Sequence, residues 1–270
     1  MSPAPVRVAH LTDTHLLAEP DQRFCGIDSF GALKGLLEEI QRDSWKPDLL
    51  LITGDLSDDG SAASYRRLRE LLIPLGLPVY CLPGNHDDRA VMHASLEGGS
   101  IQLARVVAHD SWQIVLLDSQ VPGKTHGNLS NDELDDLERA LLQAPGLFTL
   151  VGLHHGPYPV CPVPGCRLEN SEALLRMLSG CKNTRAVVAG HTHCEINEPL
   201  AGIQMLVTPS TCINVTHPSG PDAPLAGSFW ELHGVQEGRR GYRRLELHAD
   251  GTIVTSVVWQ GEEADAEVHR

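Results

Sequence analysis

LLLITGD, residues Leu49–Asp55, is the stretch around which the rest of the chain can be arranged. Four consecutive branched apolar residues at its start are typical of a strand that is buried on both faces. Thr53 and Gly54 interrupt the apolar run, and Asp55 stands where the strand should end. Ligands of open α/β sheets bind beyond the carboxyl ends of the strands, and a buried carboxylate needs a cationic partner. Asp55 is therefore a candidate ligand for a cation.

Four more segments share this design, because each is an apolar run that ends in Asp, Asn or His. They are Val8–His15 (VAHLTDTH), Val79–Asp87 (VYCLPGNHD), Leu147–His155 (LFTLVGLHH) and Ala186–His193 (AVVAGHTH). We expect the five strand ends to converge on one site, since the carboxyl ends of parallel strands meet at one edge of a sheet. The polar side chains that they would bring there are Asp13, His15, Asp55, Asn85, His86, His154, His155, His191 and His193.

The segments between these strands have the apolar spacing of helices, several of them after a capping residue such as Ser29, Ser61 or Ser130. Helices are predicted over residues 30–43, 62–75, 88–97, 131–143 and 171–179. Strands are predicted over residues 6–11, 49–53, 79–82, 101–109, 112–117, 147–153, 185–188, 203–208, 228–233, 242–248 and 252–259. Strands that alternate with helices and then follow one another predict an α/β fold of two packed sheets with helices outside.

The chain has the size and composition of one large α/β domain. Its 270 residues are 41% hydrophobic, which is enough for a full core, and no linker or repeat divides residues 1–270. The core should span about residues 6–258, and we expect the acidic tail at residues 261–270 to be disordered.

The formal charge of −14 argues against nucleic acid and anionic membranes as partners. It leaves room for an anionic small molecule, because bound cations can reverse the field locally. No signal peptide and no membrane span is predicted, and the seven scattered cysteines are typical of reduced thiols in a cytoplasmic protein. The role of the Cys- and Pro-rich loop at residues 157–168 and the choice between a monomer and a homodimer stay open.

The polar residues at the strand ends are carboxylates and imidazoles, which together suit borderline divalent metals such as Mn, Fe, Zn, Co or Ni. Cysteine is absent from the set, which argues against a structural zinc site. The number of ligands suits two cations rather than one. After two aspartates and a bridging hydroxide are counted, roughly one positive charge remains, enough to attract a phosphodiester anion. This pattern is typical of two-metal hydrolysis of phosphoesters.

The five motifs together resemble the calcineurin-like metallophosphoesterase superfamily. They are D-x-H (Asp13, His15), G-D (Gly54, Asp55), G-N-H-D (Gly84–Asp87), H (His154) and G-H-x-H (Gly190–His193). Further segments, including ITGDLSDDGSAASY, TPSTC and RRLELHADGT, are similar to one branch, the bacterial class III 3′,5′-cyclic AMP phosphodiesterases of the CpdA type. The resemblance covers about residues 6–258 and implies a four-layer α/β/β/α sandwich, with two mixed sheets flanked by helices.

The resemblance also implies roles for individual residues. One cation would take Asp13, His15, Asp55 and His193, and the other would take Asp55, Asn85, His154 and His191. Iron and manganese are the cations most expected, with zinc, cobalt and nickel as alternatives. A hydroxide held between the two cations would attack phosphorus in line with the leaving oxygen. Asp55 as the shared ligand and His86 as a group that touches the phosphate and assists the leaving oxygen would be catalytic.

Substrate contacts are implied for His15, Asn85, His86 and His193, with His155 and His126 as further candidates. Asp87 would orient His86 or a ligand from behind. The sequence departs from related ones at Gly156, where Pro or His is common after the two histidines. We assign the metal to His154 rather than to His155.

The function implied is hydrolysis of 3′,5′-cyclic AMP to 5′-AMP. Two alternatives remain: a phosphodiesterase of broader specificity that acts on 2′,3′-cyclic nucleotides or other small diesters, and a nucleotide-binding regulator with little turnover. For three other polar residues we favour simple structural roles. Asp58 and Asp59 are interpreted as helix caps, and His10 as a hydrogen-bonded or surface histidine.

Overall fold

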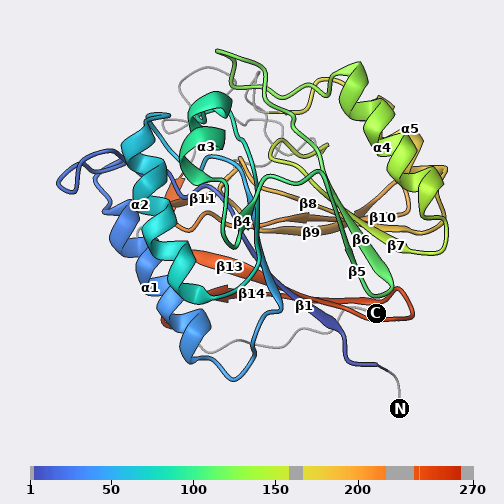
Figure 1. Ribbon diagram of the computed structural model, residues 1–270, viewed down its shortest axis with the longest axis horizontal. Coiled ribbons are helices and arrows are strands. Elements are labelled where there is room, and N and C mark those ends of the chain that lie inside the picture. The colour runs from blue at the N-terminus through green and yellow to red at the C-terminus, as the bar shows by residue number, and fades with distance from the viewer. Residues whose placement is uncertain (1–2, 158–166, 217–233, 237, 263–270) are drawn as a thin grey trace.

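Strand β2 (Leu49–Thr53) lies inside a six-stranded sheet, and all five of its residues are buried. Leu50 and Ile52 point to one hydrophobic cluster, whereas Leu49 and Leu51 point to another on the opposite face. The prediction of a strand buried on both faces is thus confirmed. The computed structural model describes residues 3–157, 167–216, 234–236 and 238–262, and the two sheets and their helices are shown in Figure 1.

The first sheet has the strand order β14-β13-β1-β2-β3-β4. Its strands are β1 (Val6–Leu11), β2, β3 (Val79–Leu82), β4 (Ile101–Gln102), β13 (Gly241–Leu247) and β14 (Ile253–Trp259). Strands β1 to β4 are parallel, and the β13–β14 hairpin joins them antiparallel at β1. The sheet is therefore mixed, as predicted.

The second sheet has the order β5-β6-β7-β8-β10-β9. Its strands are β5 (Val106–His109), β6 (Trp112–Leu116), β7 (Phe148–Gly152), β8 (Thr184–Ala189), β9 (Ile196–Leu200) and β10 (Ile203–Val207). The outer strands β5 and β9 are antiparallel to their neighbours, and β6, β7, β8 and β10 are parallel. A small separate ribbon pairs β11 (Asn214–Thr216) with β12 (Gly234–Gln236).

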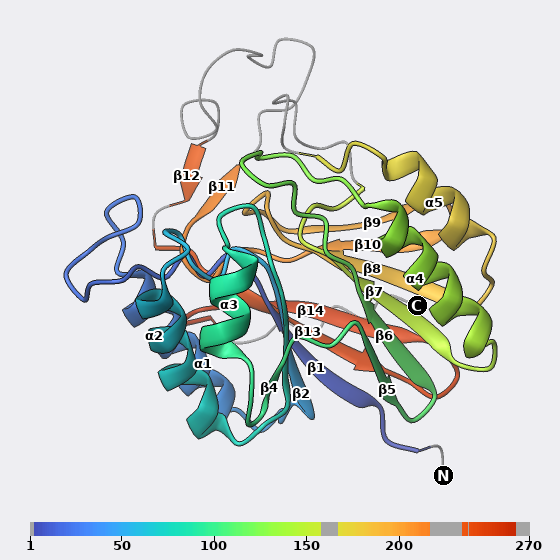
Figure 2. The same cartoon turned by 45° about the horizontal axis from the view of Figure 1, so that its top comes forward.

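Helices cover the outer face of each sheet, as two views of the molecule show (Figure 1, Figure 2). The first sheet carries α1 (Ser29–Arg42), α2 (Ala62–Leu72), a 3₁₀ turn η1 (Ile73–Leu75) and α3 (Arg89–Leu96). The second sheet carries α4 (Asn131–Gln143) and α5 (Ser171–Ser179). The order of layers is helix, sheet, sheet, helix, which confirms the predicted α/β/β/α sandwich.

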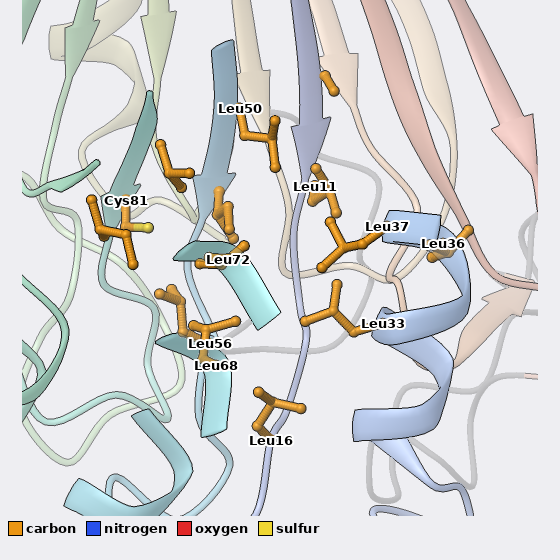
Figure 3. Close-up of a cluster of buried hydrophobic side chains, with 14 of the residues drawn as sticks. Leu11, Leu16, Leu33, Leu36, Leu37, Leu50, Leu56, Leu68, Leu72 and Cys81 are labelled. Atoms are coloured by element: carbon orange, nitrogen blue, oxygen red, sulfur yellow. The ribbon is translucent and has the colours of Figure 1, made fainter. Parts of the chain in front are cut away.

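Leucines at helical spacing attach α1 to the first sheet. Leu33, Leu36 and Leu37 are buried on one side of the helix, and Figure 3 shows them facing the strands that carry Leu11 and Leu50. Burying a leucine side chain contributes about 1.5–3 kcal/mol. The two sheets meet through a separate cluster with members from both, so the central strands of each sheet are buried on both faces.

Several predicted boundaries are wrong. Residues 101–109 are not one strand, because β4 pairs with β3 in the first sheet whereas β5 pairs with β6 in the second. The chain crosses between the sheets at this point, which an apolar pattern alone does not reveal. Asp28 rather than Ser29 caps α1, since its side chain accepts a hydrogen bond from the backbone N–H of Gly31.

The strands β9, β11 and β12 were not predicted. β9 is an edge strand with a largely exposed pattern and contains Pro199, so it lacks the apolar alternation that identifies a strand. The predicted strand at residues 228–233, most of the loop at residues 157–168 and most of the acidic tail lie outside the described residues. In the part of the chain that the structure describes, no helix is long and apolar enough to cross a membrane.

Candidate metal centre

The polar residues at the ends of five parallel strands meet between the two sheets. β1, β2 and β3 of the first sheet lead into the residues that follow Leu11, Thr53 and Leu82, and β7 and β8 of the second sheet lead into those that follow Gly152 and Ala189. The carboxylates and imidazoles at these ends form four overlapping groups whose ligand atoms lie within 4.8 Å of one another. The convergence that the sequence predicts is thus present in the structure.

One group is built around Asp13, His15 and His193. The Nε2 atom of His193 lies 3.3 Å from Oδ1 of Asp13 and 3.2 Å from Nε2 of His15. His15 and His193 are each no more than 3% exposed, and Asp13 is wholly buried. These two imidazole nitrogens and one carboxylate oxygen are buried and face one another. Such a donor set suits a borderline divalent cation.

A second group is built around Asp55, Asn85 and His154. The Nε2 atom of His154 lies 3.2 Å from Oδ2 of Asp55 and 3.2 Å from the amide oxygen of Asn85. The same Oδ2 of Asp55 lies 3.8 Å from Nε2 of His15, which belongs to the first group. Asp55 therefore stands between the two groups, where one carboxylate can serve two cations.

The two histidines of G-H-x-H are directed to different groups. The His191 ring lies 5.0 Å from the ring of His154, and the His193 ring lies 5.1 Å from that of His15. Both residues have a positive φ, 71° for His191 and 50° for His193, so the backbone here is not extended. The loop separates the side chains, as the sequence predicts.

Carbonyl oxygens behind the rings orient the imidazoles. Nδ1–H of His154 donates to the carbonyl of Thr53 at 2.8 Å, and Nδ1–H of His193 donates to the carbonyl of Ile213 at 2.8 Å. Each bond leaves Nε2 facing the site. Outer partners of this kind are usual for metal-binding histidines, because they set the tautomer and the direction of the ring.

Two further observations indicate that the residues of this site are suited to bind a pair of cations. Nε2 of His191 is buried and has no hydrogen-bond partner among the described residues, although buried polar atoms are normally paired. Burial lowers and Asp55 raises the pKa of His154, with a net rise to about 9. The Asp55 carboxylate that raises this pKa would stabilise a metal cation at the same place in the same way.

Two glycines let the backbone approach the ligands closely. A Cβ atom on Gly84 would lie 2.2 Å from Oδ1 of Asp55 and 2.3 Å from its backbone nitrogen. A Cβ atom on Gly190 would lie 2.6 Å from Oδ2 of Asp13. The glycines of G-N-H-D and G-H-x-H are therefore needed for space.

His86 lies at the rim of the site. Its side chain is 38% exposed, and its Nδ1 atom lies 3.0 Å from Oδ1 of Asp58. Burial lowers its pKa, but the hydrogen bond to Asp58 and the charge of Asp55 raise it to about 9. The ring thus has one edge against the Asp58 carboxylate and one edge toward solvent.

Asp58 is a residue of this site that the sequence interpretation does not include. Its Oδ1 atom also lies 3.2 Å from Nδ1 of His15, so one carboxylate contacts both His15 and His86. Asp58 was interpreted as a helix cap, but the cap of α2 is Ser61. Its position three residues after Asp55, on the same loop, is the only signal in the sequence.

The expected contact between the Asp87 carboxylate and His86 is not among the hydrogen bonds of this carboxylate. Its carboxylate accepts hydrogen bonds from the backbone N–H groups of Leu56, Ser57 and Gly84 and from the hydroxyl of Tyr65. It therefore ties the loop after β2 to the loop after β3. This supports the ligands Asp55 and Asn85 through the backbone rather than through a side chain.

The structure does not favour His155 and His126 as substrate contacts. His155 is wholly buried, with its ring 4.5 Å from that of His191 and its Nδ1 atom 2.8 Å from Oγ of Ser119. The Nε2 atom of His155, like that of His191, is buried without a hydrogen-bond partner among the described residues, and the two rings form one group with His154. His126 lies outside the metal-ligand groups and pairs with Glu169, with 3.6 Å between Nε2 and Oε1.

Comparisons with known proteins agree with this site. The family model for calcineurin-like phosphoesterases matches residues 6–195. The 3′,5′-cyclic adenosine monophosphate phosphodiesterase CpdA of Pseudomonas aeruginosa is 36% identical over 256 residues, covering 94% of this chain and 90% of that protein. A cAMP/cGMP dual specificity phosphodiesterase of Mycobacterium tuberculosis is 35% identical over 258 residues, covering 92% and 78%. A solved structure of a dimetal phosphatase from Danio rerio has the same fold, with a TM-score of 0.67 at 14% identity over 96% of this chain and 98% of that one.

Proposed function

The chain belongs to the calcineurin-like phosphoesterase family, and from this premise we propose that it hydrolyses 3′,5′-cyclic AMP to 5′-AMP. The observation that carries the proposal is the pair of donor groups that share Asp55. The substrate is inferred from the relatives named as cyclic AMP phosphodiesterases, which match over more than nine tenths of the chain.

The residues divide between two cations. Asp13, His15 and His193 would hold one, Asn85, His154 and His191 would hold the other, and Asp55 would contact both. Two divalent cations at this place supply a water molecule with a pKa near 7 and positive charge for the phosphate oxygens. We propose iron and manganese as the cations, because mixed carboxylate and imidazole ligands suit borderline metals. Zinc, cobalt and nickel also fit such a donor set.

His86 is the proposed general acid. The Asp58 contact raises the pKa of the ring and so favours its protonated form, and its exposed edge is open to a ligand. It can donate this proton to the leaving 3′-oxygen, which makes that oxygen a neutral alcohol. We propose that Asn85 and His86, the less buried members of the set, contact the phosphate most directly, with His15 and His193 beneath it.

A second candidate is a phosphodiesterase of broader specificity. The relative from Mycobacterium tuberculosis, named as acting on both cAMP and cGMP, favours it. A nucleotide-binding regulator with little turnover is less favoured, because all seven candidate ligands are present and meet at one place. We further propose a cytoplasmic location, since seven scattered cysteines without a CxxC pair are typical of reduced thiols.

The test is product analysis with bound metal quantified. Purified protein is incubated with 3′,5′-cAMP, 3′,5′-cGMP, 2′,3′-cAMP and bis(p-nitrophenyl) phosphate. We expect fast, metal-dependent formation of 5′-AMP from 3′,5′-cAMP. Faster turnover of another diester would support the broader enzyme, and two bound metals without any turnover would support the regulator. Asp55→Asn should lose metal and activity, whereas Asp132→Asn on the exposed side of α4 should keep both.

A further inference from the structure

Two buried ionisable residues take no part in the proposed reaction. His10 on β1 and Arg243 on β13 are both 0% exposed and are paired neighbours in the first sheet. Burying a guanidinium ion costs several kcal/mol unless its N–H groups are satisfied. Most of the contacts that satisfy Arg243 lead from the first sheet toward the second.

Arg243 joins the two sheets through hydrogen bonds. Its NH2 group donates to the carbonyl of Val207 at 2.8 Å and to that of Ile196 at 3.1 Å, both in the second sheet. Its NH1 group donates to Oγ1 of Thr255 at 3.2 Å, and its Nε–H group donates to Oγ1 of Thr208 at 3.3 Å. Thr208 directly follows β10, so the guanidinium holds the end of that strand.

The Arg243 guanidinium starts a series of hydrogen bonds that runs through Thr208 and His10 to Thr53, and it gives this hydrogen-bond chain a direction. Arg243 can only donate, so the hydroxyl oxygen of Thr208 accepts and its hydrogen is available for Nδ1 of His10, 2.6 Å away. Burial and Arg243 lower the pKa of His10 to about 3, so the ring is neutral and carries one proton. We assign that proton to Nε2, so that Nδ1 accepts from Thr208 and Nε2–H donates to Oγ1 of Thr53 at 2.8 Å.

The chain ends behind a proposed metal ligand. The carbonyl of Thr53 accepts the Nδ1–H bond of His154 at 2.8 Å and the hydroxyl bond of Thr12 at 2.9 Å. Thr53 is wholly buried. Its side chain is therefore held by His10 while its backbone carbonyl sets the direction of the His154 ring.

We propose that Arg243 is a positioning residue that acts through Thr208 and His10 to fix Thr53, and thereby aims His154 at the second cation. The proposal rests on the proposed function, since it assumes that His154 binds metal. Loss of an outer partner of a metal-binding histidine typically weakens metal binding about 10- to 100-fold. Breaking the hydrogen-bond chain at Thr208 should weaken metal binding by about the lower of these values, because the effect reaches His154 only through His10 and Thr53.

Two threonine variants provide a matched pair. Thr208→Val and Thr255→Val each remove one hydroxyl that accepts from Arg243, but only Thr208 leads on to His10. The affinity of each protein for Mn²⁺ is measured by titration, and the tautomer of His10 is read from ¹⁵N NMR. We expect Thr208→Val to bind the second Mn²⁺ ion, the one at His154, about tenfold less tightly. In the same variant His10 should no longer be present only as its Nε2–H tautomer. Thr255→Val should keep both properties, and Thr208→Ser, which retains a hydroxyl, should recover them.

The outcomes separate this proposal from the proposed function. The positioning role would be overturned if wild-type protein binds two Mn²⁺ ions and the Thr208→Val variant binds both of them with the same affinity. A wild-type His10 with its proton on Nδ1 would also overturn it. Wild-type protein that binds no Mn²⁺ would instead refute the proposed metal site, and the His10 tautomer would still decide whether the hydrogen-bond chain runs as described.

Discussion

At the residue scale, the backbone conformation of the proposed ligands is unusual. Asp13, His15, Asp55, His191 and His193 have φ angles between 45° and 71°, a left-handed region that residues with a side chain rarely adopt. Each costs about 1–3 kcal/mol and persists only where the surroundings enforce it. Such strain is concentrated at functional sites, so its presence at five ligands independently supports the assignment of this site.

His86 is expected to affect the rate rather than metal binding. It lies at the rim and contacts Asp58, so His86→Ala should keep both cations while kcat falls by about 10²- to 10⁴-fold, the usual contribution of a general acid. Metal content and kcat are measured on the same preparation. The control is His93→Ala, since His93 is exposed on α3 and pairs only with Glu97 among the described residues. Metal lost together with activity in His86→Ala would contradict this role.

Binding of the second cation should depend on pH through His154. Asp55 raises the pKa of His154 to about 9, whereas burial and His154 lower that of His191 to about 3. Below pH 9 a cation must therefore displace one proton from His154 and none from His191. The affinity should rise about tenfold per pH unit between about pH 6 and pH 8 and level off above about 9. Titration with Mn²⁺ across this range tests it, and an affinity independent of pH would exclude the mechanism.

The sequence identifies the proposed ligands well because each follows an apolar run directly. It does not identify Asp58, whose role depends on a loop that brings one carboxylate against both His15 and His86. Nor does it separate the adjacent His154 and His155 by any local pattern. Both rings are fully buried, and they differ in their contacts: Nε2 of His154 faces Asp55, whereas Nδ1 of His155 faces Ser119.

At the element scale, the loops after β2 and β3 must lie almost in contact. Gly84→Ala would place a methyl group against the backbone of Asp55, which costs about 1–3 kcal/mol of stability and displaces the shared ligand. We expect lower unfolding free energy in urea and loss of bound metal. Gly146→Ala is the matched control, because nothing lies within 4 Å of the added Cβ atom, and its stability should change by less than about 0.5 kcal/mol. Equal behaviour of the two variants would show that the close approach is unimportant.

The sequence predicts elements with a strong apolar period with only small errors at their ends. It does not predict where the chain crosses from one sheet to the other. The run from Ile101 to His109 reads as one strand because most of its residues are apolar and no Gly or Pro interrupts it. Its two halves belong to different sheets because β4 and β5 pair with strands that are distant in the chain. Pairing of this kind depends on the whole fold, so no local pattern predicts the division.

At the scale of the whole molecule, the cations would link the two sheets. Asp13, Asp55 and Asn85 come from the first sheet, and His154 and His193 follow strands of the second. Metal should therefore stabilise the folded protein as a whole, by about 2.7 kcal/mol at a free concentration of one hundred times the dissociation constant. Thermal unfolding with Mn²⁺ and with a chelator measures the shift in Tm. Asp55→Asn should show little shift, and an equal shift in that variant would place the stabilising cation elsewhere.

The position of the β13–β14 hairpin has a consequence for synthesis on the ribosome. Strand β13 is inserted between β14 and β1, although β1 precedes both strands of the hairpin by more than 200 residues in the sequence. Until residues 241–259 emerge, the nascent chain lacks Arg243 and leaves one edge of β1 unpaired. Open strand edges invite pairing with other chains. We therefore expect this edge of the nascent chain to need protection by a chaperone until translation has passed the hairpin.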